Sequence, residues 1–228
     1  MNKVKITAII AAAGSSSRMN GINKQLYNLS GKPVIAHTVN AFENTAEITD
    51  IIIVTKADYI DEYKEICIKY GFKKVSAIIE GGRERTDSVR CGIKAASEAD
   101  YIAIHDGARA CITPKQIRLL CQEAQKYGSA VPGYQITDTV KRVKDGNICA
   151  NADRNNLFAV QTPQIFKAEI LKDAYSKATD TNSTDDSSVV FGAGYEVHIV
   201  QTEKNNIKIT TPEDLEAAKK ILYERERK

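Results

Sequence analysis

The sequence contains few of the residues from which disulfide scaffolds and metal centres are built. Only five cysteines and three histidines occur in 228 residues, and no two cysteines have the Cys-x-x-Cys spacing. An odd number of scattered cysteines argues against a disulfide framework and against a structural zinc site. Because unpaired cysteines are typical of a reducing compartment, we expect a cytoplasmic protein.

Long apolar runs are absent too. The apolar stretch at residues 6–13 is too short to span a membrane and leads directly into a polar loop. We therefore interpret it as a core strand and not as a signal peptide. Hydrophobic residues make up 43% of the chain and charged residues 27%, which is typical of a soluble globular protein, so we expect no membrane partner.

An excess of one charge is also missing. Lysine and arginine number 32 against 29 aspartates and glutamates, which gives a net charge of +3. Nucleic-acid-binding proteins usually carry a clustered basic face, so this mild charge argues against a nucleic-acid partner. It is compatible with a small anionic substrate.

Three familiar catalytic motifs do not occur. The absence of GxxxxGK[ST] argues against a P-loop phosphotransferase, and the first loop lacks the GxGxxG of dinucleotide oxidoreductases. The sequence also has no GxSxG motif and no plausible Ser-His-Asp set, which argues against a serine hydrolase.

What the sequence does contain is a regular alternation of short β-branched runs with helix-like stretches. It predicts strands at residues 6–12, 50–55, 75–79 and 101–105, and a fifth that begins at 130–131. It predicts helices at residues 33–42, 59–70, 87–97 and 114–127, the third of them capped by Thr86. Four strand–helix repeats in succession predict an α/β fold, with a mainly parallel sheet covered by helices on both faces.

Residues 134–157 interrupt this rhythm with local alternation, few large apolar residues and an Asp145-Gly146 turn. The pattern predicts a hairpin that protrudes from the domain. A lone hairpin cannot bury both of its faces, so we expect it to pack against a second subunit. A solvated meander on the parent sheet is the alternative.

The rest of the chain returns to short elements. The sequence predicts a helix at 167–177, a polar segment at 179–188, strands at 195–200 and 206–210, and a last helix that begins at 211–213. Because no internal repeat, linker or second core is visible, residues 1–228 are predicted to form a single domain with an arm at about 134–157.

Ligands of parallel sheets bind beyond the carboxyl ends of the strands, and three segments leave the predicted sheet there. The first is the loop with Gly14, three serines, Arg18 and Lys24. It would suit a polyphosphate, because small residues let the backbone approach and cations offset negative charge; a simple turn is the alternative. The other two segments are the EGGRER loop at 80–85 and the end of a strand at Asp106.

Asp106 is a natural Mg²⁺ ligand, since Mg²⁺ is usually held by one or two carboxylates together with substrate phosphates. A turn residue is the alternative. Arg109 could pair with Asp106 or contact a ligand, and Lys208 could point into the crevice or into water. Arg154 could reach the site of a neighbouring subunit.

Two other pairs of polar residues receive no catalytic role. His37 and His198 have no partner in the sequence and are interpreted as packing or surface residues. Asp185 and Asp186 are interpreted as a loop or a helix cap, with a metal-ligand role as the weaker alternative.

Eight motifs run through nearly the whole chain: AAAGSSSRM, EGGRERTDSV, HDGAR, TDTVK, DRNNL, QTPQIF, TDDSS and NIKITTPEDL. Together they resemble the 2-C-methyl-D-erythritol 4-phosphate cytidylyltransferase family of the non-mevalonate pathway of isoprene biosynthesis. The resemblance implies a Rossmann-like nucleotidyltransferase fold whose β-arm clasps the partner in a homodimer. It also implies a Mg²⁺-dependent reaction of CTP with methylerythritol phosphate, a polyol phosphate.

The resemblance implies roles for individual residues as well. The catalytic cations would be Arg18, Lys24 and Lys208. The nucleotide would be bound by Ala12, Ala13, Gly14, Gly82, Ser88 and Asp106. The second substrate would be bound by Asp106, Arg109, Thr139, Arg154, Thr184 and Lys208, with Thr139 and Arg154 reaching across the dimer, and Asp106 would be the metal ligand.

The sequence departs from the family pattern at three places. Asn23 and Ala110 stand where proline is usual, and Ser15–Ser17 replace a stretch that often has a second glycine. We therefore expect residues 15–23 to be disordered without nucleotide. Two other functions compete with the first: a ribitol 5-phosphate cytidylyltransferase, and a nucleotide-binding regulatory module that has lost catalysis.

Overall fold

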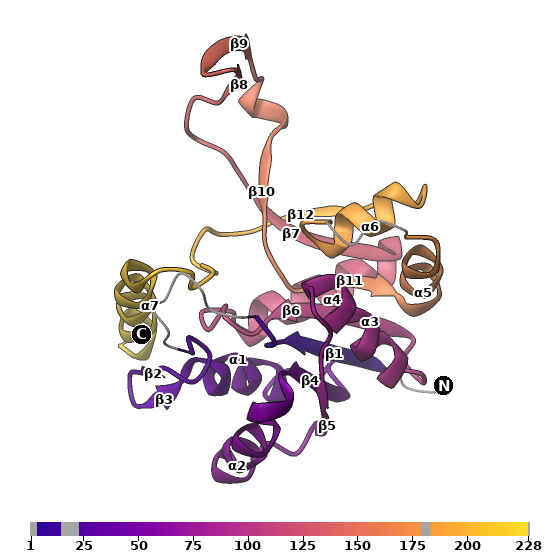
Figure 1. The fold of residues 1–228 in the computed structure, drawn as a ribbon, viewed down its shortest axis with the longest axis vertical. Helices are drawn as coiled ribbons and strands as arrows, with labels where there is room; N and C mark the ends of the chain where they lie inside the picture. Colours follow the sequence, from indigo (N-terminus) through magenta and orange to yellow (C-terminus); the bar gives the residue numbers. More distant parts are fainter. Residues whose placement is uncertain (1–3, 15–22, 179–182, 228) are drawn as a thin grey trace.

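The computed structural model describes residues 4–14, 23–178 and 183–227. Figure 1 shows a layered body from which one long hairpin projects. Eight strands of the described residues form one sheet in the order β10-β7-β11-β6-β1-β4-β5, with β12 beside β7. Their bounds are β1 Ile6–Ala11, β4 Asp50–Thr55, β5 Val75–Glu80, β6 Tyr101–Asp106, β7 Ser129–Gln135, β10 Phe158–Val160, β11 Gln164–Lys167 and β12 Ile199–Gln201.

The first four predicted strands are confirmed as parallel neighbours. β1 pairs in parallel with β4 and β6, and β4 pairs in parallel with β5. The fifth predicted strand, β7, does not join them directly, because β11 lies between β6 and β7 and is antiparallel to both. The sheet is therefore mixed, with a parallel half that carries the loops expected to bind ligands.

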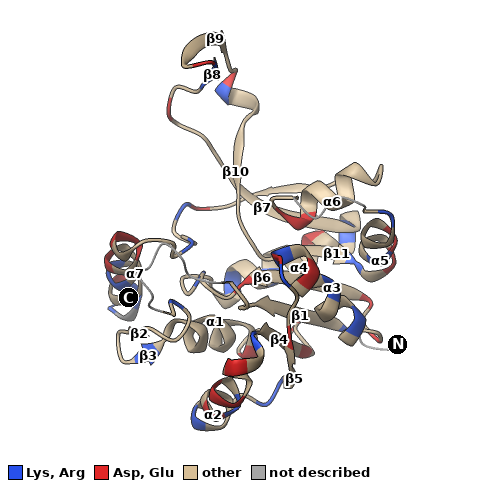
Figure 2. Ribbon diagram, in the orientation of Figure 1, with Lys and Arg blue, Asp and Glu red and all other residues tan. Residues whose placement is uncertain are grey.

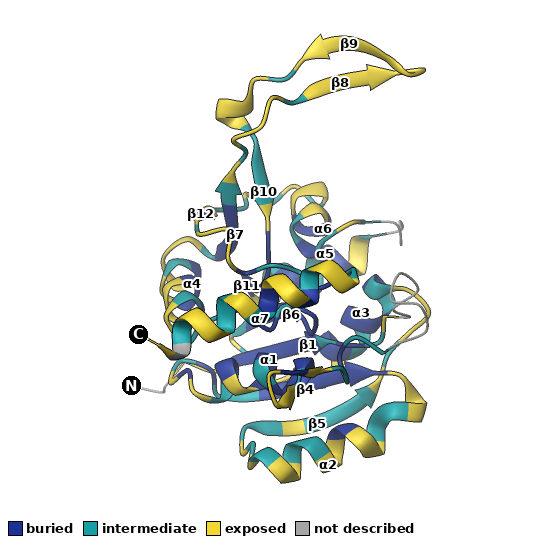
Figure 3. Cartoon of the chain, turned by 90° about the vertical axis from the view of Figure 1, so that its left-hand side faces the viewer, coloured by how far each residue is buried: buried dark blue, intermediate teal, exposed yellow. Residues whose placement is uncertain are grey.

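Helices cover both faces of the sheet, as predicted. Their bounds are α1 Val34–Glu43, α2 Ile60–Tyr70, α3 Arg85–Ala95, α4 Pro114–Tyr127, α5 Ala168–Lys177, α6 Asp186–Gly192 and α7 Pro212–Glu226. Adjacent β1 residues point to opposite faces: Ile10 packs with residues of α1, α2 and α4, and Ile9 with residues of α3, α5 and α6. Both isoleucines are fully buried, and each such burial stabilises the fold by about 1.5–3 kcal/mol. Figure 3 shows the buried strands at the centre and exposed residues on the outer helix surfaces.

Shorter elements complete the described chain. They are the small pair β2 Asn28–Leu29 and β3 Lys32–Pro33, the single turns η2 Ala57–Tyr59 and η3 Arg154–Asn156, and the arm strands β8 Lys141–Lys144 and β9 Asn147–Asn151. None of the described helices is long and apolar enough to cross a membrane. The assignment of residues 1–228 to a single domain stays a prediction.

Two helix ends follow the local sequence signals and one helix start does not. Gly71 and Gly128 end α2 and α4 with positive φ angles of 67° and 81°, which glycine adopts without strain. The prediction that Thr86 caps α3 is wrong. The helix begins at Arg85, so Thr86 lies buried in its first turn. The N-cap residue is Glu84, whose N–H donates to the Asp87 carboxylate at 3.2 Å.

Two strand predictions near the C-terminus need correction: the first strand is shorter than predicted, and the second is wrong. Only Ile199–Gln201 of the segment 195–200 forms a strand, and the segment 206–210 forms none. The backbone of this second segment is bound by the loop after β6 instead: Ile209 N donates to Ala108 O at 2.9 Å, and Asn206 O accepts from Arg109 at 2.7 Å. These contacts fix an irregular path that carries Lys208 to the edge of the sheet.

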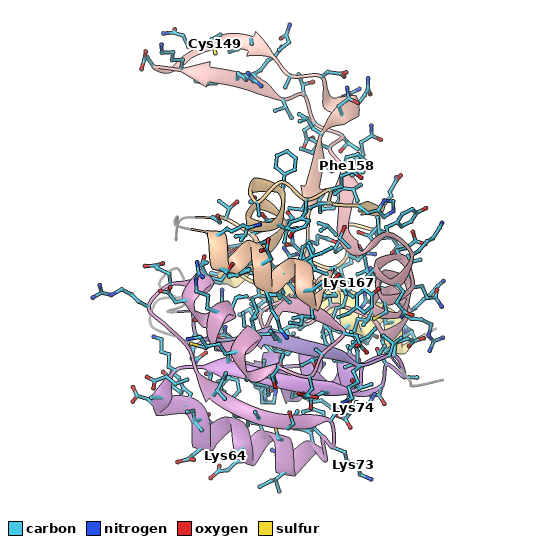
Figure 4. The ribbon with its side chains drawn as sticks, turned by 90° about the vertical axis from the view of Figure 1, so that its right-hand side faces the viewer. Lys64, Lys73, Lys74, Cys149, Phe158 and Lys167 are labelled. Carbon is cyan, nitrogen blue, oxygen red and sulfur yellow. The ribbon has the colours of Figure 1, made fainter. Side chains whose placement is uncertain are left out.

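The arm protrudes as predicted. The residues of β8 and β9 are exposed throughout, and Asp145 and Gly146 have the positive φ angles of a tight hairpin turn. Cys149 lies near the tip of the arm and Phe158 where the chain returns to the body (Figure 4). Val143 and Ile148, both apolar, are 61% and 67% exposed. The hairpin is therefore not a meander on the parent sheet.

Candidate active site

Two cavities adjoin at the carboxyl edge of the parallel strands. The larger, of about 640 Å³, is lined by the first loop, the loop after β5 and the segment that carries Lys208. The smaller, of about 370 Å³, lies between the loop after β6 and the start of α6. Three residues line both cavities: Arg85, Asp106 and Lys208. The convergence of separate segments that the sequence predicts is thus confirmed.

Asp106 lies at the centre of this arrangement. Its side chain is 9% exposed, and its Oδ2 lies 2.9 Å from Lys208 Nζ and 3.4 Å from Arg109 Nε, while its Oδ1 lies 3.2 Å from Arg85 Nε. Burial alone would raise the pKa of the Asp106 carboxyl, but the charges of Arg85, Lys208 and Arg109 hold it well below its usual range. The carboxylate is therefore ionised at neutral pH, and Lys208 points into the crevice rather than into water.

A buried hydrogen-bond chain fixes the backbone of Asp106. Its N–H donates to Thr162 Oγ1 at 3.1 Å, and Thr162 Oγ1 lies 3.0 Å from His105 Nδ1. Burial lowers the pKa of His105 to about 3, so the imidazole is neutral. Because the Thr162 hydroxyl can then donate to Nδ1, we assign the imidazole proton to Nε2, which faces Arg109 O at 3.4 Å.

The loop that carries Gly82 packs tightly on the start of α3. A Cβ at Gly82 would lie 2.3 Å from the Asp87 Cβ, and one at Gly81 would lie 2.6 Å from the Ser88 hydroxyl oxygen. Glycine is therefore required at both positions if this loop is to keep its path. Gly82 and Ser88 both line the larger cavity, as expected for residues beside a nucleotide.

The described part of the first loop places Ala13, Gly14 and Lys24 on the wall of the larger cavity. Ala12 instead lies buried in the core, where its N–H donates to Val54 O at 2.7 Å. Asn23 holds the turn that carries Lys24, since its side chain accepts from Gln25 N at 3.1 Å. Arg18 lies outside the described residues, as do residues 15–22 of the loop whose disorder we expect.

The residues expected to bind the second substrate fall into two groups. Arg109 and Thr184 line the smaller cavity together with Asp106 and Lys208. Thr139 and Arg154 lie exposed on the arm, and neither belongs to the described lining of the two cavities. Within one chain, the structure therefore does not bring the arm residues to the site.

Sequence reasoning missed the part played by Arg85, Asp186 and Tyr175. Arg85 binds both oxygens of Asp186, at 3.0 and 2.7 Å, and Tyr175 donates to the same carboxylate at 2.6 Å. Asp185, by contrast, caps α6 as interpreted, accepting from Ser188 N at 3.0 Å. A pair of adjacent aspartates followed by serines signals a helix cap, but nothing in the pattern distinguishes a buried Asp186 from a capping one.

The two remaining histidines fit their assignment to packing or surface. His37 lies 2.7 Å from Leu29 O through Nε2, and His198 stacks on Tyr127 at 3.9 Å between ring centroids.

Lys and Arg are interspersed with Asp and Glu over the outer helices α2, α5 and α7 (Figure 2).

A model of the family described as 2-C-methyl-D-erythritol 4-phosphate cytidylyltransferase matches residues 6–224. The chain belongs to this family. The resemblance drawn from eight motifs is thereby confirmed, and with it the assignment to the nucleotidyltransferases.

Members of the cytidylyltransferase family match the chain along nearly its whole length. The protein of that name from Halalkalibacterium halodurans is 41% identical over 228 residues, covering 99% of this chain and 100% of the relative. The one from Lachnoclostridium phytofermentans is 42% identical over 227 residues, covering 96% and 97%. The solved 4-diphosphocytidyl-2C-methyl-D-erythritol synthase of Anaerococcus prevotii has a TM-score of 0.84 at 30% identity, with 97% of both chains covered. This confirms the Rossmann-like nucleotidyltransferase fold.

Proposed function

We propose that the protein transfers CMP from CTP to 2-C-methyl-D-erythritol 4-phosphate, giving 4-(cytidine 5'-diphospho)-2-C-methyl-D-erythritol and pyrophosphate. The observation that carries the proposal is the pair of adjoining cavities that meet at Asp106 and Lys208, in a chain of this family. The larger cavity would hold CTP and the smaller one the polyol phosphate.

The reaction needs no nucleophile from the protein. An oxygen of the acceptor phosphate attacks the α-phosphorus of CTP in line, and the bond to the bridging oxygen breaks, so that its electron pair leaves with pyrophosphate. Both reactants are anions and repel each other. Lys24 and Lys208, which both line the larger cavity, would offset this repulsion. Catalysis then consists of positioning and charge stabilisation, to which Arg18 is proposed to contribute.

The proposed Mg²⁺ fits the chemistry of these residues in one respect. Among the described residues, no cluster of three or more His, Cys, Asp or Glu side chains could hold a metal ion by itself. A single carboxylate at the edge of a cavity suits Mg²⁺, which is commonly bound by one or two carboxylates plus substrate phosphates. Asp106 would hold the ion, which when bound offsets charge on the triphosphate.

We further propose a cytoplasmic homodimer in which each arm completes the partner's site. The exposed Val143 and Ile148 on the arm support this, because a two-stranded hairpin gains stability by covering such side chains. Thr139 and Arg154 would then reach the partner's acceptor phosphate. The free cysteines of the described chain support the reducing compartment.

A pyrophosphate-release assay with CTP, Mg²⁺ and each polyol phosphate in turn tests the function. Release is expected with 2-C-methyl-D-erythritol 4-phosphate. Release with ribitol 5-phosphate alone would show that the acceptor is wrong. CTP binding without release with either acceptor would instead support the regulatory module.

Replacing Arg154 with alanine tests the arm. Loss of a cation that binds only the acceptor phosphate is expected to raise the KM of the polyol phosphate by about tenfold or more, with little change in the KM of CTP. Arg142→Ala removes the same charge from β8 of the same arm and serves as the control. A larger effect of Arg154→Ala on CTP than on the acceptor would refute this placement.

A further inference from the structure

Arg85 joins Asp106 to a second, fully buried carboxylate. Its Nε donates to Asp106 Oδ1 at 3.2 Å, while Nη1 and Nη2 donate to the two oxygens of Asp186 at 3.0 and 2.7 Å. The hydroxyl of Tyr175 donates to Asp186 Oδ1 at 2.6 Å, so the buried charge has three donors. One rigid, planar guanidinium is thus fixed by a bidentate pair and aims its remaining edge at Asp106.

These contacts connect two helices that are distant in sequence. Arg85 is the first residue of α3, and Asp186 is the first residue of α6. The residues around the start of α6, including Thr184, Asp185 and Ser187, line the smaller cavity. A displacement of Asp186 would therefore move one wall of that cavity.

The three cations at Asp106 differ in their freedom to leave it. Lys208 is 39% exposed, and it shares Oδ2 with Arg109, whose Nη1 also binds Asn206 O at 2.7 Å. Arg85 is the cation at Oδ1, and its charge is offset by two carboxylates. Lys208 is thus the cation suited to turn toward an incoming phosphate, whereas Arg85 is suited to keep the carboxylate in place.

We propose that Arg85, held by Asp186 and Tyr175, is a positioning residue that fixes the Asp106 carboxylate and the α6 wall in the geometry required by the acceptor. This role rests on the proposed function, because it assigns the smaller cavity to the polyol phosphate. Arg85 also lines the larger cavity proposed for CTP, but its guanidinium is bound to Asp106 and Asp186, so we expect CTP to depend on it less than the acceptor does.

The test compares Asp186→Asn, Arg85→Lys and Tyr175→Phe with the wild type in steady-state kinetics and in CTP binding by calorimetry. Asp186→Asn removes the charge that fixes the guanidinium. Arg85→Lys keeps a positive charge but loses the planar group that binds both Asp186 oxygens. Both are expected to lower kcat/KM for the acceptor by at least about tenfold, because small misplacements of reacting groups are costly, while CTP affinity changes much less. Tyr175→Phe, which leaves the bidentate Arg85–Asp186 pair intact, is expected to have a smaller effect in the same direction.

Arg118→Lys is the matched control. Arg118 lies on α4, where its Nε pairs with Glu47 Oε1 at 3.2 Å, and it does not belong to the described lining of either cavity. The same exchange of a carboxylate-bound arginine for lysine is expected to leave kcat/KM for the acceptor unchanged.

Two results would overturn the positioning role. One is an equal loss of CTP affinity and acceptor kcat/KM in folded Arg85→Lys, which would mean that Arg85 acts on the nucleotide. The other is unaltered acceptor kinetics in the variants that circular dichroism shows to be folded; Tyr175→Phe provides this readout if the charged variants unfold. A wild-type protein inactive with both polyol phosphates would refute the proposed function instead.

Discussion

Replacing Lys24 with alanine is expected to reduce turnover by at least about 100-fold while the fold stays intact, because one positioned donor to a developing negative charge commonly contributes that much. Lys24 lines the larger cavity from the turn that follows Asn23. Its charge would lie against the triphosphate, where negative charge shifts to the leaving pyrophosphate as the bond breaks. The loss should therefore appear mainly in kcat and not in the affinity for CTP.

The control for Lys24 is Lys32→Ala. Lys32 is exposed on β3 and does not belong to the described lining of the two cavities, so the same change of charge should leave turnover unchanged. Lys24→Arg should restore part of the activity, because it returns a cation with a different shape. Near-normal turnover of folded Lys24→Ala would remove this lysine from the catalytic assignment.

Much of the fold follows from local patterns in the sequence. Short runs of β-branched residues predict the parallel strands β1, β4, β5 and β6. Gly71 and Gly128 mark helix ends because glycine adopts positive φ without strain. The position of β11 does not follow, since its insertion between β6 and β7 is decided by long-range pairing. The irregular path of residues 206–210 is likewise set by Arg109 and Ala108, which are about a hundred positions away in sequence.

The site divides in the same way. Gly82, Asp106 and Lys208 can be identified from the sequence because each lies on a segment that leaves the same edge of the sheet or carries a family motif. The Arg85–Asp186 pair cannot, because it joins residues 101 positions apart through burial that no local pattern records. The placement of Thr139 and Arg154 over a cavity depends on a second chain, and so it stays a prediction.

Replacing Asp106 with asparagine is expected to change turnover and CTP affinity in opposite directions. The substitution keeps the shape of the side chain but removes the negative charge shared by Arg85, Arg109 and Lys208. Turnover should fall by at least about 100-fold, because Lys208 and the acceptor lose the group that positions them. CTP measured without a divalent cation should bind more tightly, since a carboxylate that repels its phosphates is gone and Lys208 is released toward them.

The fold should tolerate this change better than most losses of a buried charge. Arg85 keeps its bidentate pair with Asp186, and Arg109 keeps Asn206 O, so two of the three cations retain a partner. Calorimetric titration of CTP into the EDTA-treated variant, with circular dichroism to confirm the fold, measures the binding effect. Asp100→Asn, at the residue that directly precedes β6 and so lies at the other end of that strand from Asp106, is the matched control for the loss of one carboxylate. If Asp106→Asn weakened metal-free CTP binding, Asp106 would have to contact the nucleotide as an acceptor rather than hold the cations around it. The proposal that Lys208 turns toward a phosphate while Arg85 keeps the carboxylate in place would then be wrong as well.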